Sequence, residues 1–332
     1  MRRAVNREQC TPRWTALVVA LAAALLVGCG AGGPLSARTV TVTVTSQPDS
    51  EASNPPESAT PATQAAGGAA VTDTQVASQG SGQASTPAAV WPTAAAREAE
   101  AFAEGFASVQ RRLSGPASVA LVPVGGGRVL AAGELETGVA WSTSKVPLAI
   151  AALRASDSAQ TRRDVTTAIR DSDNPASARL WAGLGLGERA AAKVEAVLRE
   201  AGDRTTQVPA GRSRPPYSSF GQMQWSTPDA AGFAARLPCL AGSGPVVAHM
   251  RRVTDTQQWG FWHVDGAAVK GGWGPVDGGY LVRQVAIVPV AQGGSVGAAL
   301  LVHAPTFEEA TADLDVIAEW AAGFAEPMGA AC

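Results

Sequence analysis

The stretch Ser142-Thr143-Ser144-Lys145-Val146-Pro147-Leu148-Ala149-Ile150 is the most informative part of the chain. It predicts the start of a helix, over 144–155, where a serine and a lysine stand three positions apart. Residues with this spacing lie on one face of a helix, so Ser142 and Lys145 can touch. A serine hydroxyl is a weak nucleophile until a base removes its proton, and a buried lysine can be that base. The alternative is a capped helix beside a solvated lysine.

Lysine is rare in this sequence, which makes its position informative. The chain has 26 Lys and Arg residues, of which only those at 145, 193 and 270 are lysines. Arginine keeps its proton in proteins and cannot serve as a base. The lysine beside Ser142 is therefore a candidate for proton transfer.

Two further stretches carry polar groups suited to a site. Asp171-Ser172-Asp173-Asn174-Pro175 lies between two predicted helices, where Asn174 can cap the second helix and Pro175 can occupy its first position. Lys270-Gly271-Gly272-Trp273-Gly274 is expected to end an apolar strand and turn toward the next, and its glycines let the backbone approach a ligand. Each stretch alone also fits an ordinary loop or turn.

The hydrophobic pattern predicts one α+β domain over 95–332. Strands are expected at 117–124, 128–132, 267–270, 280–290 and 296–302. Helices are expected at 95–113, 144–155, 161–170, 176–184, 188–201, 228–236, 243–253 and 306–324. The simplest closure is one antiparallel five-stranded sheet that uses both ends of the domain. Its first and last helices flank the sheet, and the middle is inserted as a helical lobe.

The order of the three motifs, Ser-x-x-Lys, Ser-Asp-Asn and Lys-Gly-Gly, resembles the penicillin-recognising serine hydrolases, meaning class A β-lactamases and penicillin-binding proteins. The resemblance extends over about 95–332 and includes Ser226-Thr227-Pro228-Asp229 at the start of a helix. It implies the β-lactamase/DD-peptidase fold and a covalent serine mechanism. It implies no cofactor, and the three histidines share no metal-ligand spacing.

The resemblance also implies a role for each matching residue. Ser142 would be the acylated nucleophile and Lys145 its activating base. Ser172 would relay a proton to the leaving group, while Lys270 would bias that proton and bind a substrate carboxylate. The substrate-binding positions would be Asn174, Gly271, Gly272 and Trp273, with the N–H groups of Ser142 and Trp273 forming an oxyanion hole.

Three departures from the family pattern alter these expectations. Gly271 stands where the family's K-T-G motif has a threonine, so carboxylate recognition should be weaker or altered. Ser142 and Ser172 are only 30 positions apart, which implies a trimmed lobe. The segment 204–226 contains no Asp or Glu that could activate a deacylating water, although Gln222 or Gln224 could orient one. The sequence therefore supports acylation better than deacylation.

The first 94 residues differ in kind from the domain. Four arginines precede an apolar run, Trp14–Val27, that is too short to span a bilayer and is typical of a signal peptide. The run ends in Leu26-Val27-Gly28-Cys29, which resembles a bacterial lipobox. We expect a signal peptide over 1–28, a lipidated Cys29, and a disordered tether over 29–94 rich in Ala, Ser, Thr, Pro and Gly. The protein would then be exported and lipid-anchored to the outer face of the cytoplasmic membrane.

Charge and cysteine content limit the partners. With 26 basic and 28 acidic residues the formal net charge is −2, which argues against nucleic acid as the main partner. Outside the cytoplasm Cys239 and Cys332 could form a disulfide or stay free, and the sequence leaves both possibilities open.

Three functions remain in competition. The first is a serine hydrolase that forms an acyl-enzyme with β-lactams or D-Ala-D-Ala-type peptides and deacylates slowly. The second is a binding module that keeps the fold, has lost the chemistry and holds a peptidoglycan stem peptide or a protein partner. The third is an esterase or amidase that uses the same Ser-Lys site on another substrate.

Overall fold

One five-stranded antiparallel sheet organises the part of the chain that the structure describes. This computed structural model describes residues 93–332. The strand order is β2-β1-β7-β6-β5, so the two ends of the domain meet at the centre of the sheet, where β1 pairs with β7. The strands are β1 (Ala117–Pro123), β2 (Leu130–Gly133), β5 (Ala268–Val276), β6 (Gly279–Pro289) and β7 (Ser295–Ala304). The predicted α+β class and its antiparallel sheet are confirmed.

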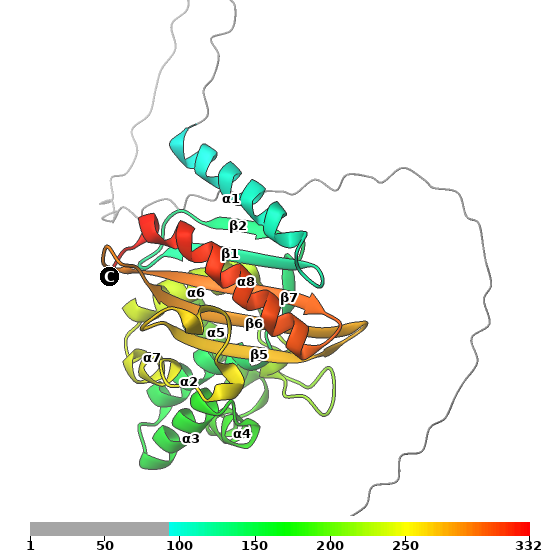
Figure 1. Ribbon diagram of the computed structural model, residues 1–332. Helices are drawn as coiled ribbons and strands as arrows, with labels where there is room; N and C mark the ends of the chain where they lie inside the picture. The colour runs from blue at the N-terminus through cyan, green and yellow to red at the C-terminus, as the bar shows by residue number, and fades with distance from the viewer. Residues whose placement is uncertain (1–92) are drawn as a thin grey trace, which may run out of the picture. The chain divides into compact units, whose positions relative to one another are not determined.

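Helices α1 (Ala94–Gln110) and α8 (Phe307–Ala325) cover one face of this sheet (Figure 1). Aromatic side chains join the two helices, with ring centroids 4.9 Å apart for Phe102 and Trp320 and 5.1 Å apart for Phe102 and Phe324. Alternate strand residues such as Val119 and Leu300 point into this layer, as the two-residue period of a strand requires. This apolar layer therefore covers the face of the sheet that points away from the helical lobe.

The opposite face carries α6 (Thr227–Arg236) and the helical lobe. A Cβ on Gly297 of β7 would lie 2.6 Å from the carbonyl oxygen of Ala231, so the close packing of α6 on β7 requires glycine there. The lobe contains α2 (Lys145–Ala155), α3 (Ala159–Arg170), α4 (Asn174–Gly183) and α5 (Gly187–Glu200), and α7 (Gly244–Met250) packs beside α3. The inserted lobe lies toward the β5 edge of the sheet in Figure 1.

A two-stranded clip holds the lobe's ends together. It pairs β3 (Thr137–Val139) with β4 (Gln224–Ser226), two strands too short to show a pattern in the sequence. The buried guanidinium of Arg283, on β6, links the paired strands β3 and β4 to the large sheet by hydrogen bonds. Its Nη1 donates to the carbonyls of Gly138 and Trp225 at 3.0 and 3.1 Å.

Strand β5 corrects one prediction about the Lys-Gly-Gly motif. The strand does not end at Lys270; it continues through the glycines to Val276 in register with β6, pairing Lys270 with Val285 and Gly272 with Arg283. Glycine is needed at 271, 272 and 274 because neighbouring groups pack closely against the strand at these positions. The chain does not turn there. Helix boundaries also shift by a few residues, and Asp173 rather than Asn174 caps α4.

Two findings concern the remaining predictions about the whole chain. Cys239 and Cys332 form a disulfide with a Cα–Cα distance of 5.5 Å. Within 93–332, no helix combines the length and apolar character needed to cross a bilayer. The predicted signal peptide, Cys29 and most of the tether, up to residue 92, lie outside the described residues.

Candidate active site

The Ser142 motif lies on a short 3₁₀ helix, η1 (Trp141–Ser144), that leads directly into α2. Trp141 adopts a left-handed backbone conformation, with φ at +48°, which is uncommon for a bulky residue. Its ring lies against Gly274, where a Cβ would come within 2.5 Å of the indole. A side chain on Gly272 would likewise lie 2.8 Å from the backbone nitrogen of Ser142. These glycines bring the edge of β5 against the turn that carries Ser142.

The edge of β5 presents backbone N–H groups toward the Ser142 turn. The N–H of Gly271 donates to Oε1 of Gln257 at 3.3 Å, so it points away from the neighbouring strand β6. Alternate residues of a strand repeat the same direction, so the N–H of Trp273 points to the same edge. Since Gly272 lies against the backbone of Ser142, the N–H groups of Ser142 and Trp273 can converge on one substrate oxygen as an oxyanion hole.

Lys145 is buried beside the Ser-Asp-Asn turn, with 1% of its surface exposed. Its Nζ donates to Oδ1 of Asn174 at 2.8 Å and to the carbonyl of Ser172 at 2.5 Å, and lies 3.4 Å from Oγ of Ser172. Burial lowers the pKa of Lys145 to about 7, and the charge of Asp173 opposes this shift. A large fraction of Lys145 is therefore neutral at neutral pH and able to accept a proton.

Lys270 forms the other side of the proton network. Its Nζ donates to Oγ of Ser172 at 3.0 Å, to the carbonyl of Gly271 at 2.8 Å, and to Oε1 of Gln257. Burial, reinforced by the positive charge of Lys145, holds the pKa of Lys270 well below its ordinary value. The Ser172 hydroxyl thus lies between two lysine amines, an arrangement suited to passing a proton. Lys270 is fully buried in this structure, and its binding of a substrate carboxylate stays a prediction.

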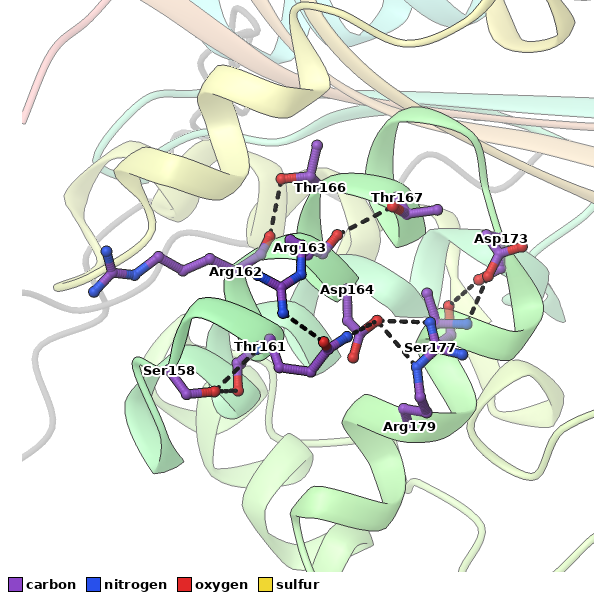
Figure 2. A network of polar contacts seen from close by, with 12 residues as sticks. Ser158, Thr161, Arg162, Arg163, Asp164, Thr166, Thr167, Asp173, Ser177 and Arg179 are labelled. Carbon is purple, nitrogen blue, oxygen red and sulfur yellow. Dashed lines mark hydrogen bonds and ion pairs between the residues drawn. The ribbon is translucent and has the colours of Figure 1, made fainter.

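Helices α3 and α4 hold the Ser-Asp-Asn turn in place (Figure 2). Asp173 accepts from the N–H of Ala176 at 2.6 Å, and its carbonyl accepts from the Ser177 hydroxyl at 2.6 Å, so the turn is fixed to α4. Asp164 on α3 pairs with Arg179 on α4 at 2.6 Å and joins the two helices. The Arg179 guanidinium lowers the pKa of the Asp164 carboxyl. Ser172 itself has a left-handed backbone, with φ at +56°, which this support maintains.

A cavity of about 530 Å³ opens onto Ser142 and Lys145. It lies between the lobe, the segment 212–222 and Trp273 of β5. No Asp or Glu is among the described residues that line it, whereas the exposed Arg212 is. The lining residues are Trp141, Ser142, Lys145, Asn174, Pro175, Ala178, Arg212, Pro216, Tyr217, Ser218, Phe220, Gly221, Gln222 and Trp273. Its size suits a small peptide-like substrate.

The structure brings most of the predicted site residues together. Ser142, Lys145, Asn174 and Trp273 line the cavity, and Ser172 and Lys270 lie directly behind it through the hydrogen bonds described above. Gly271 and Gly272 do not line the cavity; each provides space for a neighbour, Trp259 and Ser142 respectively.

One further residue of the site, Gln257, belongs to no sequence motif that could have revealed it, whereas Gln222 is one of the two glutamines that the sequence analysis named for orienting a water. Gln257 is fully buried and donates to the carbonyl of Arg170 at 2.9 Å while its oxygen accepts from Lys270 and Gly271. Gln222 lines the cavity with only 5% of its surface exposed. Gln224, the other glutamine considered for a water, is exposed on β4 and does not line the cavity.

Comparison with solved structures agrees with this architecture. A β-lactamase from Burkholderia vietnamiensis superposes with a TM-score of 0.55 at 18% identity, covering 68% of this chain and 96% of the other. A β-lactamase from Xanthomonas campestris gives 0.52 at 18% identity, covering 68% and 98%. The class A β-lactamase of Mycobacterium abscessus gives 0.50 at 17% identity, covering 66% and 98%.

The chain has a class A β-lactamase fold. No protein-family model and no curated protein matches the sequence. The similarity is therefore one of three-dimensional fold. A shared fold does not by itself establish the chemistry of this β-lactamase-fold domain, which depends on its own residues.

Proposed function

We propose that the β-lactamase-fold domain is a serine hydrolase that forms an acyl-enzyme through Ser142 with β-lactams or D-Ala-D-Ala-type peptides. The observation that carries the proposal is the burial of Lys145 in the wall of the cavity that Ser142 also lines, because this burial lowers the pKa of the lysine to about 7 and lets it act as a base. A buried lysine with a lowered pKa, in a cavity that a serine three residues before it also lines, is typical of an active site.

The site supports a balanced acylation step. Neutral Lys145 takes the proton of Ser142 as Oγ forms a bond to the substrate carbonyl carbon. The N–H groups of Ser142 and Trp273 stabilise the resulting oxyanion, each by about 3 kcal/mol. The C–N bond then breaks as the Ser172 hydroxyl gives its proton to the leaving nitrogen. The Lys145 ammonium restores that proton to Ser172 across their 3.4 Å contact.

Deacylation is proposed to be slow. A water that attacks the acyl-ester needs a base, and no carboxylate is among the described residues that line the cavity. Lys145 is then the base nearest to the ester. The protein is therefore expected to accumulate the acyl-enzyme rather than turn over β-lactams rapidly.

Intact-mass spectrometry of the full chain with a penicillin and a chromogenic cephalosporin tests this proposal. We expect a mass increase of one β-lactam per chain that the Ser142→Ala variant does not show. Rapid cephalosporin hydrolysis without a persistent adduct would contradict slow deacylation. Absence of both adduct and turnover would contradict the β-lactam and D-Ala-D-Ala proposal and favour a binding module.

A second candidate is an esterase or amidase for substrates that lack a carboxylate beside the scissile bond. It is favoured by the complete burial of Lys270 and by the missing hydroxyl at Gly271. A panel of p-nitrophenyl esters separates the two candidates. Hydrolysis that depends on Ser142, without acylation by any β-lactam, would support the second.

We also propose, from the N-terminal sequence alone, that the chain is exported and anchored by a lipidated Cys29 to the outer face of the cytoplasmic membrane. Cell fractionation of the wild type and a Cys29→Ser variant tests this. The wild type should follow the membrane fraction and incorporate labelled palmitate. Equal behaviour of the two proteins would contradict the anchor.

A further inference from the structure

Gln222 combines three properties that an ordinary core residue does not share. It belongs to the short helix η2 (Phe220–Gln222), which packs against the η1 turn that carries Ser142. Its side chain helps to line the same cavity as Ser142 and Lys145. Its Nε2 atom is buried and has no hydrogen-bond partner among the described residues.

A buried amide without a partner requires an explanation. Leaving such a group unsatisfied costs about 1–3 kcal/mol, so a core position would favour an apolar residue of the same shape. The carboxamide of Asn174 differs, because its oxygen accepts from Lys145 and the residue is exposed, so its amide is not enclosed without a partner. Gln222 is therefore the nearly buried amide on the cavity wall, and turning its carboxamide about the Cγ–Cδ bond exchanges the enclosed nitrogen and the oxygen, so that either can face a molecule in the cavity.

We propose that Gln222 binds and orients the water that hydrolyses the Ser142 acyl-enzyme, with Lys145 as the base. This inference rests on the proposed function. The water oxygen forms a bond to the ester carbonyl carbon while its proton passes to the neutral amine of Lys145. The tetrahedral intermediate then collapses, Oγ of Ser142 leaves, and the Lys145 ammonium returns a proton to it. The products are the free acid and the restored serine.

Two substitutions at this position give opposite expectations. Gln222→Met keeps the shape of the side chain and removes its hydrogen bonds. It should slow deacylation about 3- to 10-fold, leave the acylation rate unchanged, and leave stability unchanged or raised, because the unsatisfied amide is gone. Gln222→Glu places a carboxylate base beside the water. It should accelerate deacylation by about 100-fold and make its rate rise with pH as the new carboxyl ionises.

Gln224→Met and Gln224→Glu are the matched controls, since Gln224 is two residues away, exposed and outside the cavity. The experiment follows the acyl-enzyme of the full chain by mass spectrometry after a brief exposure to penicillin, or to a p-nitrophenyl ester, across pH 5–9. Acylation and its decay are thus measured separately.

The outcomes distinguish the inference from the proposal on which it rests. Slower decay in Gln222→Met and faster decay in Gln222→Glu, with both controls like the wild type, would support it. Unchanged decay in both Gln222 variants, with normal acylation, would overturn the role of Gln222 and leave the proposed function standing. Loss of acylation in Gln222→Met would show that the residue acts earlier and overturn it too. No acylation of the wild type would contradict the proposed function itself.

Discussion

The indole of Trp259 occupies the space that a side chain at position 271 would need. A Cβ on Gly271 would lie 2.6 Å from Cζ2 of Trp259, whose Nε1 is held by the carbonyl of Thr256 at 3.0 Å. Gln257, two residues before this tryptophan, binds both Lys270 and the N–H of Gly271. The segment 256–259 therefore closes the inner end of the site, where related K-T-G motifs have a threonine hydroxyl.

Gly271→Thr should destabilise the domain rather than restore carboxylate recognition. Forcing a larger residue against Trp259 costs about 1–3 kcal/mol. Combining it with Trp259→Val should cost less than the sum of the single changes, because the second substitution opens the space the threonine needs. Urea unfolding of the two single variants and the double variant measures this coupling. Strict additivity would mean that the two positions do not compete for one space.

Gly272→Ala should slow acylation strongly with little effect on the rest of the fold. Its Cβ would lie 2.8 Å from the backbone nitrogen of Ser142, so β5 and the nucleophile turn must separate and the oxyanion hole opens. Loss of one oxyanion-hole donor reduces the rate by about 10²- to 10³-fold. The rate of penicillin adduct formation provides the measurement. Gly232→Ala is the matched control, because a Cβ there, within α6, meets no neighbour within 4 Å; normal acylation is expected.

Acylation should increase with pH through the pKa of Lys145, which burial lowers to about 7. Only the neutral amine accepts the serine proton, so the rate should fall about tenfold per pH unit below that value and level off above it. Lys145→Arg should be inactive at every pH. Stopped-flow acylation between pH 5 and 9 tests this, and a pH-independent rate would exclude Lys145 as the base.

The same lowered pKa predicts a stability profile. From about pH 7 to the ordinary lysine value of 10.5, the unfolded chain binds a proton at Lys145 that the folded protein does not. Stability should therefore rise with pH across that window, as far as this residue is concerned. Lys145→Met should remove its contribution to the slope and raise stability at pH 7. Urea unfolding at several pH values measures both effects.

Removing the disulfide should strongly destabilise the domain. Cys239 and Cys332 are 93 positions apart, and closing a loop of that length stabilises a protein by about 4.6 kcal/mol in the chain-entropy description. The double variant Cys239→Ser/Cys332→Ser should therefore unfold at a markedly lower urea concentration than the oxidised wild type. The reduced wild type should match the double variant, and equal midpoints with and without reductant would contradict the expectation.

The three polar motifs of the candidate site could be predicted from the sequence because each is short and local, whereas their surroundings could not. Ser142 and Lys145 share a helix turn, and Ser172 and Asn174 share a loop, so their proximity within each motif follows from spacing alone. Gln257 acts through contacts with residues far away in the sequence, and no local pattern distinguishes it from a surface glutamine. Gln222 could be named only together with Gln224, because burial separates the two and the sequence does not show it. The strand β5 was predicted too short because glycines usually mark turns, and here they mark close packing.

Because β3 and β4 pair with each other, the helical lobe begins and ends at one place and can be replaced as a unit. Both ends of the lobe leave the sheet side by side, fastened by one buried arginine, Arg283, to the carbonyls of Gly138 and Trp225. Helices between these ends can be shortened, lengthened or replaced without altering the register of the large sheet. The short separation of Ser142 and Ser172 in the sequence is then a difference confined to the helical lobe. A lobe from another protein of this fold, grafted between the two clip strands, would bring its own counterparts of Ser142, Lys145 and Ser172. It should then work with the Lys270 and the β5 edge of this domain.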